Sequence, residues 1–277
     1  MLFANPRRLA RRITYNMQCV RRSVHPLKSP DRNIASSTAE VRRRRVLAGA
    51  LGGVGAMVLS SCSTHAAAPP NPATGAKVQP LATNPDQALQ LLRDGNRRFV
   101  DNHAEHVDDN PQRRMAVSGT QVPFATILGC VDSRVPVELI FDRGFGDLVV
   151  IRSAGEVLDR SVVGSLEFGV AELNTPLLMV LGHQRCGALT ATVKALDARE
   201  TEPGDLGYLV DALTPAVRQA TGRPGDPVTN AVKANVVLTV AQLRQSPVLA
   251  QAESTGKMKI VGGYYDLDTG KVDVLDG

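Results

Sequence analysis

The sequence has no Trp, and aromatic residues make up only 4% of its 277 positions. Proteins that bind single-stranded nucleic acid usually stack the bases on aromatic side chains, so this composition disfavours that class. The chain has no excess of basic over acidic residues beyond its N-terminal region. Residues 1–61 contain 12 Lys or Arg and 2 Asp or Glu, whereas the rest of the chain contains 20 and 25. The larger part is mildly acidic, and we expect no nucleic-acid partner.

The N-terminal region contains an apolar run that is short for a membrane span. Residues 46–61 form a run of 16 residues, and a transmembrane helix needs about 20. Arg43-Arg44-Arg45-Val46-Leu47 resembles a twin-arginine export signal, and Leu59-Ser60-Ser61-Cys62 resembles a lipoprotein box. Cleavage after Ala66-Ala67-Ala68 and an uncleaved anchor helix are the alternatives. The sequence therefore predicts export to the periplasm or the outer face of the cell membrane, with a lipid anchor at Cys62.

Composition divides the chain into three parts. Residues 1–61 form an N-terminal extension and export signal, of which the first 41 residues are either a misassigned start or a disordered extension. Residues 62–84 are rich in Ala, Pro, Asn and Thr and have the composition of a flexible linker. Residues 85–277 are long enough for one α/β domain.

Short apolar runs alternate with helical patterns in this domain. A helix is expected over 85–100, with Asn84 as its cap and Pro85 at its start. Continuous apolar runs at 124–128, 148–151, 177–181 and 260–264 predict strands buried on both faces, and 272–275 predicts an edge strand. Helical patterns cover 162–173 and 188–196, and two more lie between 206 and 243. The pattern predicts an α/β fold with a mostly parallel central sheet flanked by helices.

Metal-binding side chains follow two of the predicted strands. Cys130 comes directly after the first strand, and His183 and Cys186 follow the third. Ligands of open parallel sheets lie at the carboxyl ends of the strands, so these three side chains should meet. Two Cys and one His leave one position of a zinc tetrahedron open, which is typical of a catalytic site. A disulfide between Cys130 and Cys186, or two inert thiols, are the alternatives.

The order Cys130-x-Asp132-x-Arg134 followed by His183-x-x-Cys186-Gly187 resembles the signature of the beta-class carbonic anhydrases. The similarity extends over about residues 85–270 and includes the segments 129–140, 147–155, 165–168 and 180–187. Two positions depart from the family pattern. Val131 stands where Ser is frequent, a change of little expected effect. Glu156 stands where Asn is frequent, which bears on the polarity of the substrate pocket and on local loop contacts but not on the metal ligands.

The resemblance implies one zinc ion per chain and reversible hydration of carbon dioxide to bicarbonate by zinc-bound hydroxide. Arg134 is expected to hold Asp132, which orients the water. By the same resemblance, Asp132 can also bind zinc as a fourth ligand in a closed state. Gln121, Phe168 and Gly187 match substrate-binding positions of the family. The alternatives are purely structural: Gln121 as a solvent-exposed loop residue, Phe168 as a core residue and Gly187 as the residue that permits a tight turn.

The resemblance further implies a homodimer or tetramer, with the helix over 85–100 as a dimerising helix. Hydrolysis of carbonyl sulfide or carbon disulfide on the same fold is an alternative activity. A non-catalytic zinc- or bicarbonate-binding protein is an alternative of another class, although Asp132 and Arg134 count against it because metal storage needs neither.

Overall fold

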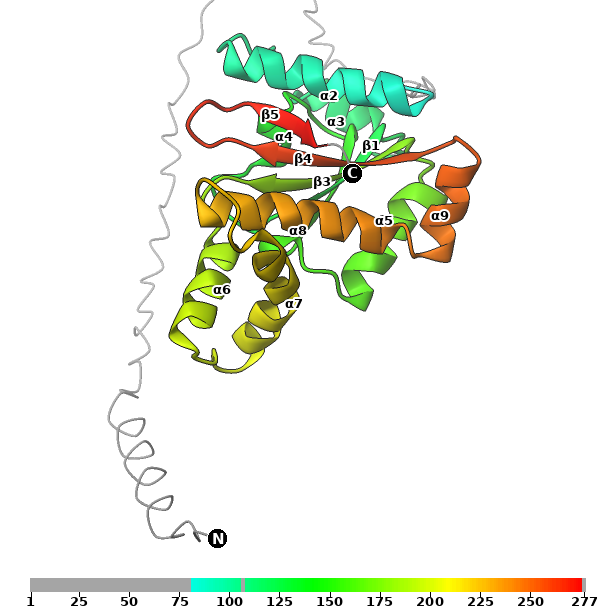
Figure 1. The fold of residues 1–277 in the computed structure, drawn as a ribbon. Coiled ribbons are helices and arrows are strands. Elements are labelled where there is room, and N and C mark those ends of the chain that lie inside the picture. Colours follow the sequence, from blue (N-terminus) through cyan, green and yellow to red (C-terminus); the bar gives the residue numbers. More distant parts are fainter. Residues whose placement is uncertain (1–80, 106–107, 276–277) are drawn as a thin grey trace, which may run out of the picture. The chain divides into compact units, whose positions relative to one another are not determined.

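The computed structural model describes residues 81–105 and 108–275, which form a sheet with helices on both faces (Figure 1). The strand order is β2-β1-β3-β4-β5. Strands β1 to β4 are parallel, and β5 is antiparallel to β4. Their bounds are β1 (Ala125–Gly129), β2 (Leu148–Arg152), β3 (Leu177–His183), β4 (Lys259–Tyr265) and β5 (Val272–Leu275). The predicted α/β fold with a mostly parallel sheet is confirmed.

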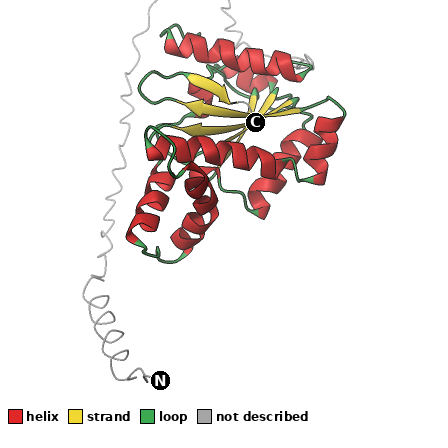
Figure 2. Cartoon of the chain, in the orientation of Figure 1, coloured by secondary structure: helices red, strands yellow, loops and turns green. Residues whose placement is uncertain are grey.

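Helices cover the sheet in two layers (Figure 2). One layer contains α2 (Pro85–Val100), α3 (Pro111–Ala116) and α4 (Val137–Ile140). The other contains α5 (Arg160–Ala171), α8 (Pro227–Leu243) and α9 (Pro247–Ser254), and α6 (Gly187–Ala198) and α7 (Asp205–Ala220) pack beside α8. A short 3-10 turn, η1 (Ala154–Glu156), follows β2. Among the described residues, no helix has the length and apolar character to cross a bilayer.

The two central strands explain the continuous apolar runs of the sequence. Every residue of β1 and β3 is buried, because helices cover both faces of the sheet at its centre. Strand β2 pairs only with β1, and four of its five residues are half-buried and the fifth exposed. Its outer edge therefore carries backbone groups that no other strand of the described residues pairs with.

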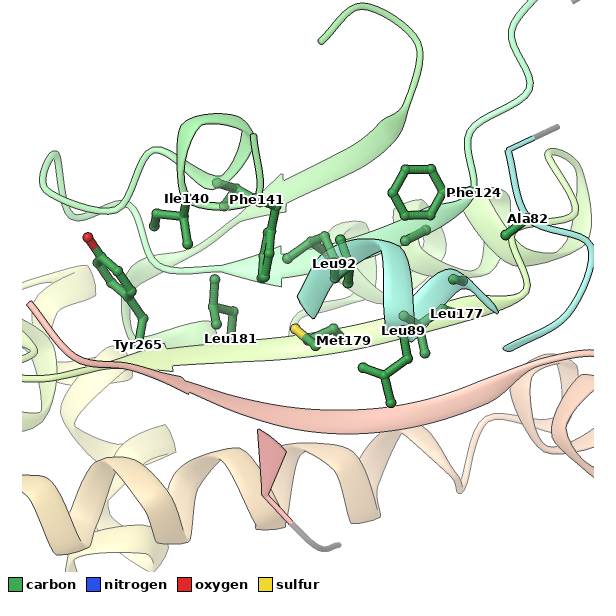
Figure 3. Packing of buried hydrophobic residues seen from close by; sticks show 14 of the residues in the cluster. Ala82, Leu89, Leu92, Phe124, Ile140, Phe141, Leu177, Met179, Leu181 and Tyr265 are labelled. Atoms are coloured by element: carbon green, nitrogen blue, oxygen red, sulfur yellow. The ribbon is translucent and has the colours of Figure 1, made fainter. Parts of the chain in front are cut away.

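Helix α2 packs on the sheet of its own chain. Asn84 caps it by accepting a hydrogen bond from Gln87 N at 2.9 Å, as the sequence predicted. Leu89 and Leu92 face the layer that contains Met179 of β3 (Figure 3). The apolar face of α2 is thus used within the chain, so only its polar face is left for the dimerising role that the sequence suggested.

The described residues also refine the predicted boundaries. Strand β3 continues two residues beyond the apolar run, so His183 is its last residue. Ala82, in the predicted linker, is buried in the same core cluster as α2. Helices α3, α4 and α9 were not predicted. The export signal and residues 62–80 of the linker lie outside the described residues.

Candidate metal centre

Three buried side chains meet at the carboxyl ends of β1 and β3. These strands are adjacent in the sheet, and Cys130 directly follows β1 while His183 ends β3. Cys186 is the N-terminal cap residue of α6. The ligand atoms of Cys130, His183 and Cys186 all lie within 4.8 Å of one another. The structure therefore brings together the three side chains that the sequence predicted as zinc ligands.

The imidazole of His183 is oriented for metal binding. Its Nδ1 lies 3.0 Å from the carbonyl oxygen of Gln184, which can only accept a hydrogen bond. Nδ1 must therefore carry the proton, and Nε2 presents a lone pair. Nε2 is buried and has no hydrogen-bond partner among the described residues. A buried acceptor beside two thiols fits a tetrahedral zinc ion, whose ligand atoms are about 3.3–3.8 Å apart.

The two thiols are free and share a hydrogen bond. Cys130 and Cys186 do not form a disulfide in the described residues. Their mutual hydrogen bond lowers the pKa of the Cys130 thiol to about 4 and raises the pKa of the Cys186 thiol, while burial opposes ionisation of both. One thiolate and one thiol thus share the proton, which zinc binding would release because both metal-bound sulfurs are thiolates.

The carboxylate of Asp132 faces this trio. Its Oδ2 lies 3.9 Å from His183 Nε2. Arg134 holds both carboxylate oxygens, with Nε 3.0 Å from Oδ1 and Nη2 2.8 Å from Oδ2. The Arg134 guanidinium and the backbone amide of Arg134 keep the pKa of Asp132 well below its usual range, against the effect of burial. The predicted dyad therefore lies at the mouth of the metal centre as an ionised pair.

Backbone contacts that the sequence analysis did not predict frame the site. Arg152 donates to the carbonyl oxygens of Cys130 at 2.7 Å and Asp132 at 2.6 Å. Arg134 Nη2 also donates to the carbonyl oxygen of Arg185 at 3.2 Å. Arg152 ends β2, so the rule that selected Cys130 and His183 could have found it. These contacts join the ends of β1, β2 and β3 into one frame.

The turn after β2 brings Gly155 and Glu156 against the metal centre. The Gly155 amide donates to Cys130 Sγ at 3.4 Å. Glu156 is buried, and burial together with the nearby Cys130 thiol raises the pKa of its carboxyl well above the ordinary value. Asn235 of α8 donates to Glu156 Oε2 at 3.3 Å. Nothing in the sequence marks Asn235, because it lies 80 residues from the turn that it contacts.

The three predicted substrate-binding residues lie in different places. Gly187 is the first residue of α6, beside Cys186, and a Cβ there would meet no atom within 4 Å. Gln121 precedes β1 and lines a cavity of about 790 Å³ at the amino end of the sheet. Strand β1 spans about 16 Å, so Gln121 is remote from the metal ligands of its own chain. Phe168 is 53% exposed on α5 and lines a shallow hollow beside β2.

Comparison with known proteins agrees with this geometry. The sequence model of a family described as carbonic anhydrase matches residues 125–272. A carbonic anhydrase of Mycolicibacterium smegmatis is 40% identical over 193 residues, covering 69% of this chain and 94% of that protein.

Solved structures are similar as well. The Coccomyxa beta-carbonic anhydrase in complex with acetazolamide has a TM-score of 0.53 and 26% identity, covering 68% of this chain and 86% of that one. A tetrameric beta-carbonic anhydrase of Sordaria macrospora has a TM-score of 0.56 and 21% identity, covering 66% and 94%.

Proposed function

The chain belongs to the beta-class carbonic anhydrase family, and we propose that Cys130, His183 and Cys186 bind the zinc ion with which it reversibly hydrates carbon dioxide to bicarbonate and a proton. Zinc, when bound, supplies the positive charge that lowers the pKa of water and so provides a nucleophile at neutral pH. The observation that carries the assignment of roles is the carboxylate of Asp132, which faces the ligand trio while Arg134 holds it.

Asp132 orients the attacking water in this proposal. An ionised carboxylate can only accept a hydrogen bond, so it fixes the direction of a water hydrogen and leaves the oxygen lone pair for carbon dioxide. Arg134 keeps Asp132 ionised, and its two side-chain contacts hold the carboxylate in place beside the metal ligands. If the Arg134 contact were lost, Asp132 would be free to serve as a fourth zinc ligand and close the site.

Gly187, Gln121 and Phe168 are proposed to contact the substrate. Gly187 begins α6, where backbone N–H groups without a helical partner favour a bicarbonate oxygen. Gln121 is distant from the metal ligands of its own chain, and Phe168 is exposed on its surface. In an assembly, each would contribute to the metal centre of a second copy of the chain. This assignment favours a homodimer or tetramer, and the exposed edge of β2 supports it.

Zinc content and hydration activity test the assignment together. The purified chain should contain about one zinc ion, measured by elemental analysis, and should hydrate carbon dioxide in a stopped-flow assay with a pH indicator. Cys130→Ser and His183→Ala should lose both properties, because each removes one of three ligands. Cys19→Ser is the matched control and should change neither. An active, zinc-free protein would overturn the proposal. A zinc-loaded protein that hydrolysed carbonyl sulfide but did not hydrate carbon dioxide would show that carbonyl sulfide is the substrate instead.

The enzyme is further proposed to work outside the cytoplasm, attached to the membrane surface through a lipid at Cys62. Support comes from the order of the arginine cluster, the apolar run and Leu59-Ser60-Ser61-Cys62 in the sequence. Thiolate ligands are vulnerable to oxidation in exported compartments. A route that exports folded protein would allow Cys130 and Cys186 to bind zinc before export.

A further inference from the structure

Glu156 combines two unfavourable features in one residue. Its backbone has a φ of 54°, directly after Gly155 with a φ of 62°. Side-chain-bearing residues rarely adopt this left-handed conformation, and such strain is often held at functional sites. The residue is 1% exposed, and Oε1 is buried without a hydrogen-bond partner in the described part of the chain. Burying an incompletely bonded carboxyl is costly, so the position demands an explanation.

The contacts of Asn235 supply that explanation. Its side-chain Nδ2 lies 2.8 Å from the carbonyl oxygen of Gly155 and 3.3 Å from Glu156 Oε2. One amide group of α8 therefore holds both residues of the left-handed turn. Leu213 of α7 closes the other side, because a Cβ on Gly155 would lie only 2.9 Å from Leu213 Cδ1. The turn is fixed from two helices and has little freedom to shift.

The Gly155 amide of this turn faces the metal centre and donates to Cys130 Sγ. A hydrogen bond to a metal-bound thiolate directs the sulfur and reduces the charge that it donates to the metal. The direction of the amide depends on the Gly155–Glu156 backbone, and Asn235 fixes that backbone. A contact on α8 is thus linked to a metal ligand at the end of β1 through one turn.

We infer that Asn235 and Glu156 form a positioning pair that holds the Gly155 amide against Cys130 and thereby sets the affinity of the site for zinc. The inference rests on the zinc site of the proposed function and deepens it. Both side chains are buried. Their effect reaches the metal through the backbone of the turn.

Zinc affinity, measured by competition with a chelator, tests the pair. Asn235→Ala and Glu156→Leu should each weaken zinc binding by about 10–100-fold, as is common when a ligand loses its supporting contact. Glu156→Gln keeps a side-chain oxygen that can accept a hydrogen bond from Asn235, so it should bind zinc with native affinity. Val240→Ala is the control, because Val240 is also buried on α8 but belongs to a core cluster other than the one that contains Cys130 and Cys186. It should lower stability and leave zinc affinity unchanged.

Two spectroscopic measurements separate positioning from a general effect on folding. In the cobalt-substituted protein, Asn235→Ala and Glu156→Leu should shift the thiolate-to-cobalt absorption, whereas Val240→Ala should not. The native protein loaded with an NMR-active cadmium isotope should show scalar coupling between the Gly155 amide proton and the metal. This measurement uses only the native protein, so it does not depend on whether any variant folds.

The outcomes are distinct. Native zinc affinity and an unchanged cobalt spectrum in both Asn235→Ala and Glu156→Leu would overturn the inference, as would the absence of the cadmium coupling in the native protein. If the native protein itself bound neither zinc nor cadmium, the proposed function would fail instead.

Discussion

Asp132 and Arg134 show how two adjacent polar residues acquire different roles from their exposure. The Asp132 side chain is 14% exposed and faces the ligands, whereas Arg134 is 51% exposed and closes over it from the solvent side. Their contact lowers the pKa of Asp132 and raises that of Arg134, so both stay charged at neutral pH. A pair of this kind on an open surface would contribute little to stability, so its value lies in orientation.

Separate removal of the two charges tests this role. Asp132→Asn and Arg134→Ala should each retain zinc and lose about 10–100-fold of the hydration rate, because neither side chain is one of the three ligands but both orient the water. Zinc content by elemental analysis and turnover by stopped flow measure the two effects. Arg218→Ala, an exposed arginine on α7, should change neither. Full turnover in both dyad variants would remove Asp132 and Arg134 from the mechanism.

The ligand residues could be predicted from sequence because chain order alone placed them. Cys130 and His183 stand at the ends of two apolar runs, and the ends of neighbouring parallel strands must meet. Asn235 gave no such signal, because its contact with Gly155 depends on how α8 lies against the turn after β2. A single polar residue inside a helical pattern does not reveal which backbone it will meet.

At the scale of elements, the loop after β3 is tied to the turn between β4 and β5. Arg185 has a φ of 53° and binds Asp268 through two contacts of 2.8 and 2.7 Å, while Gln184 donates to the same carboxylate at 3.1 Å. The carbonyl oxygen of Arg185 in turn accepts from Arg134. The hairpin therefore supports the loop between His183 and Cys186.

This link has a defined pH range. The Arg185 contact, followed by that of Gln184, lowers the pKa of Asp268 from 3.8 to about 2. Since the folded-state pKa is depressed, the stabilising contact is complete above pH 3.8 and is lost as the pH falls through about 2. NMR titration of the Asp268 carboxyl carbon should give this low midpoint, and Arg185→Gln should raise it toward 3.8. Equal midpoints in the two proteins would show that Arg185 does not hold Asp268.

The core strands and long helices were predictable, whereas short helices and packing partners were not. Continuous apolar runs marked β1 and β3 because both faces of these strands are covered. Helices α3 and α9 have six and eight residues, too few for a clear period, although Asn110-Pro111 and Ser246-Pro247 are cap signals that could have marked them. The amphipathic pattern of α2 showed that one face is apolar but not which surface covers it.

The packing of α2 on its own sheet leads to a stability prediction. Leu92 is fully buried against this core, so Leu92→Ala should lower the free energy of unfolding by about 2–5 kcal/mol. Chemical denaturation measures the change. Arg97→Ala on the exposed face of the same helix should stay within about 0.5 kcal/mol of the native value. If Leu92→Ala changed the oligomeric state and not the stability, the apolar face of α2 would belong to a subunit interface instead.

At the scale of the whole molecule, the exposed side of β2 and α5 is the expected contact between copies. Phe168→Asp should shift the protein toward smaller species in light scattering, because a charge would be buried in the interface. Tyr208→Asp is the matched control, since Tyr208 on α7 is also 53% exposed but lies on a different element. It should leave the mass unchanged. An active native protein that is strictly monomeric would contradict the expected assembly.

The charge distribution along the chain is consistent with a division into an export signal and an enzyme domain. All of the basic excess lies within residues 1–61, whereas Cys130, His183 and Cys186 come together in the part of the chain that the structure describes. If that region acts only as an export signal, changes within it should alter the location of the enzyme and leave its chemistry intact.

Fractionation of cells that express the native chain tests this separation. The native enzyme should sediment with membranes and require detergent for release, because the several acyl chains of a lipoprotein cysteine anchor stably where one chain would not. Cys62→Ser should release active enzyme in soluble form. Replacement of both Arg43 and Arg44 by Lys should retain uncleaved, zinc-loaded enzyme in the cytosol, since the twin-arginine route requires that pair. An uncleaved cytosolic enzyme whose location is the same in the native chain and in the double-lysine variant would refute export.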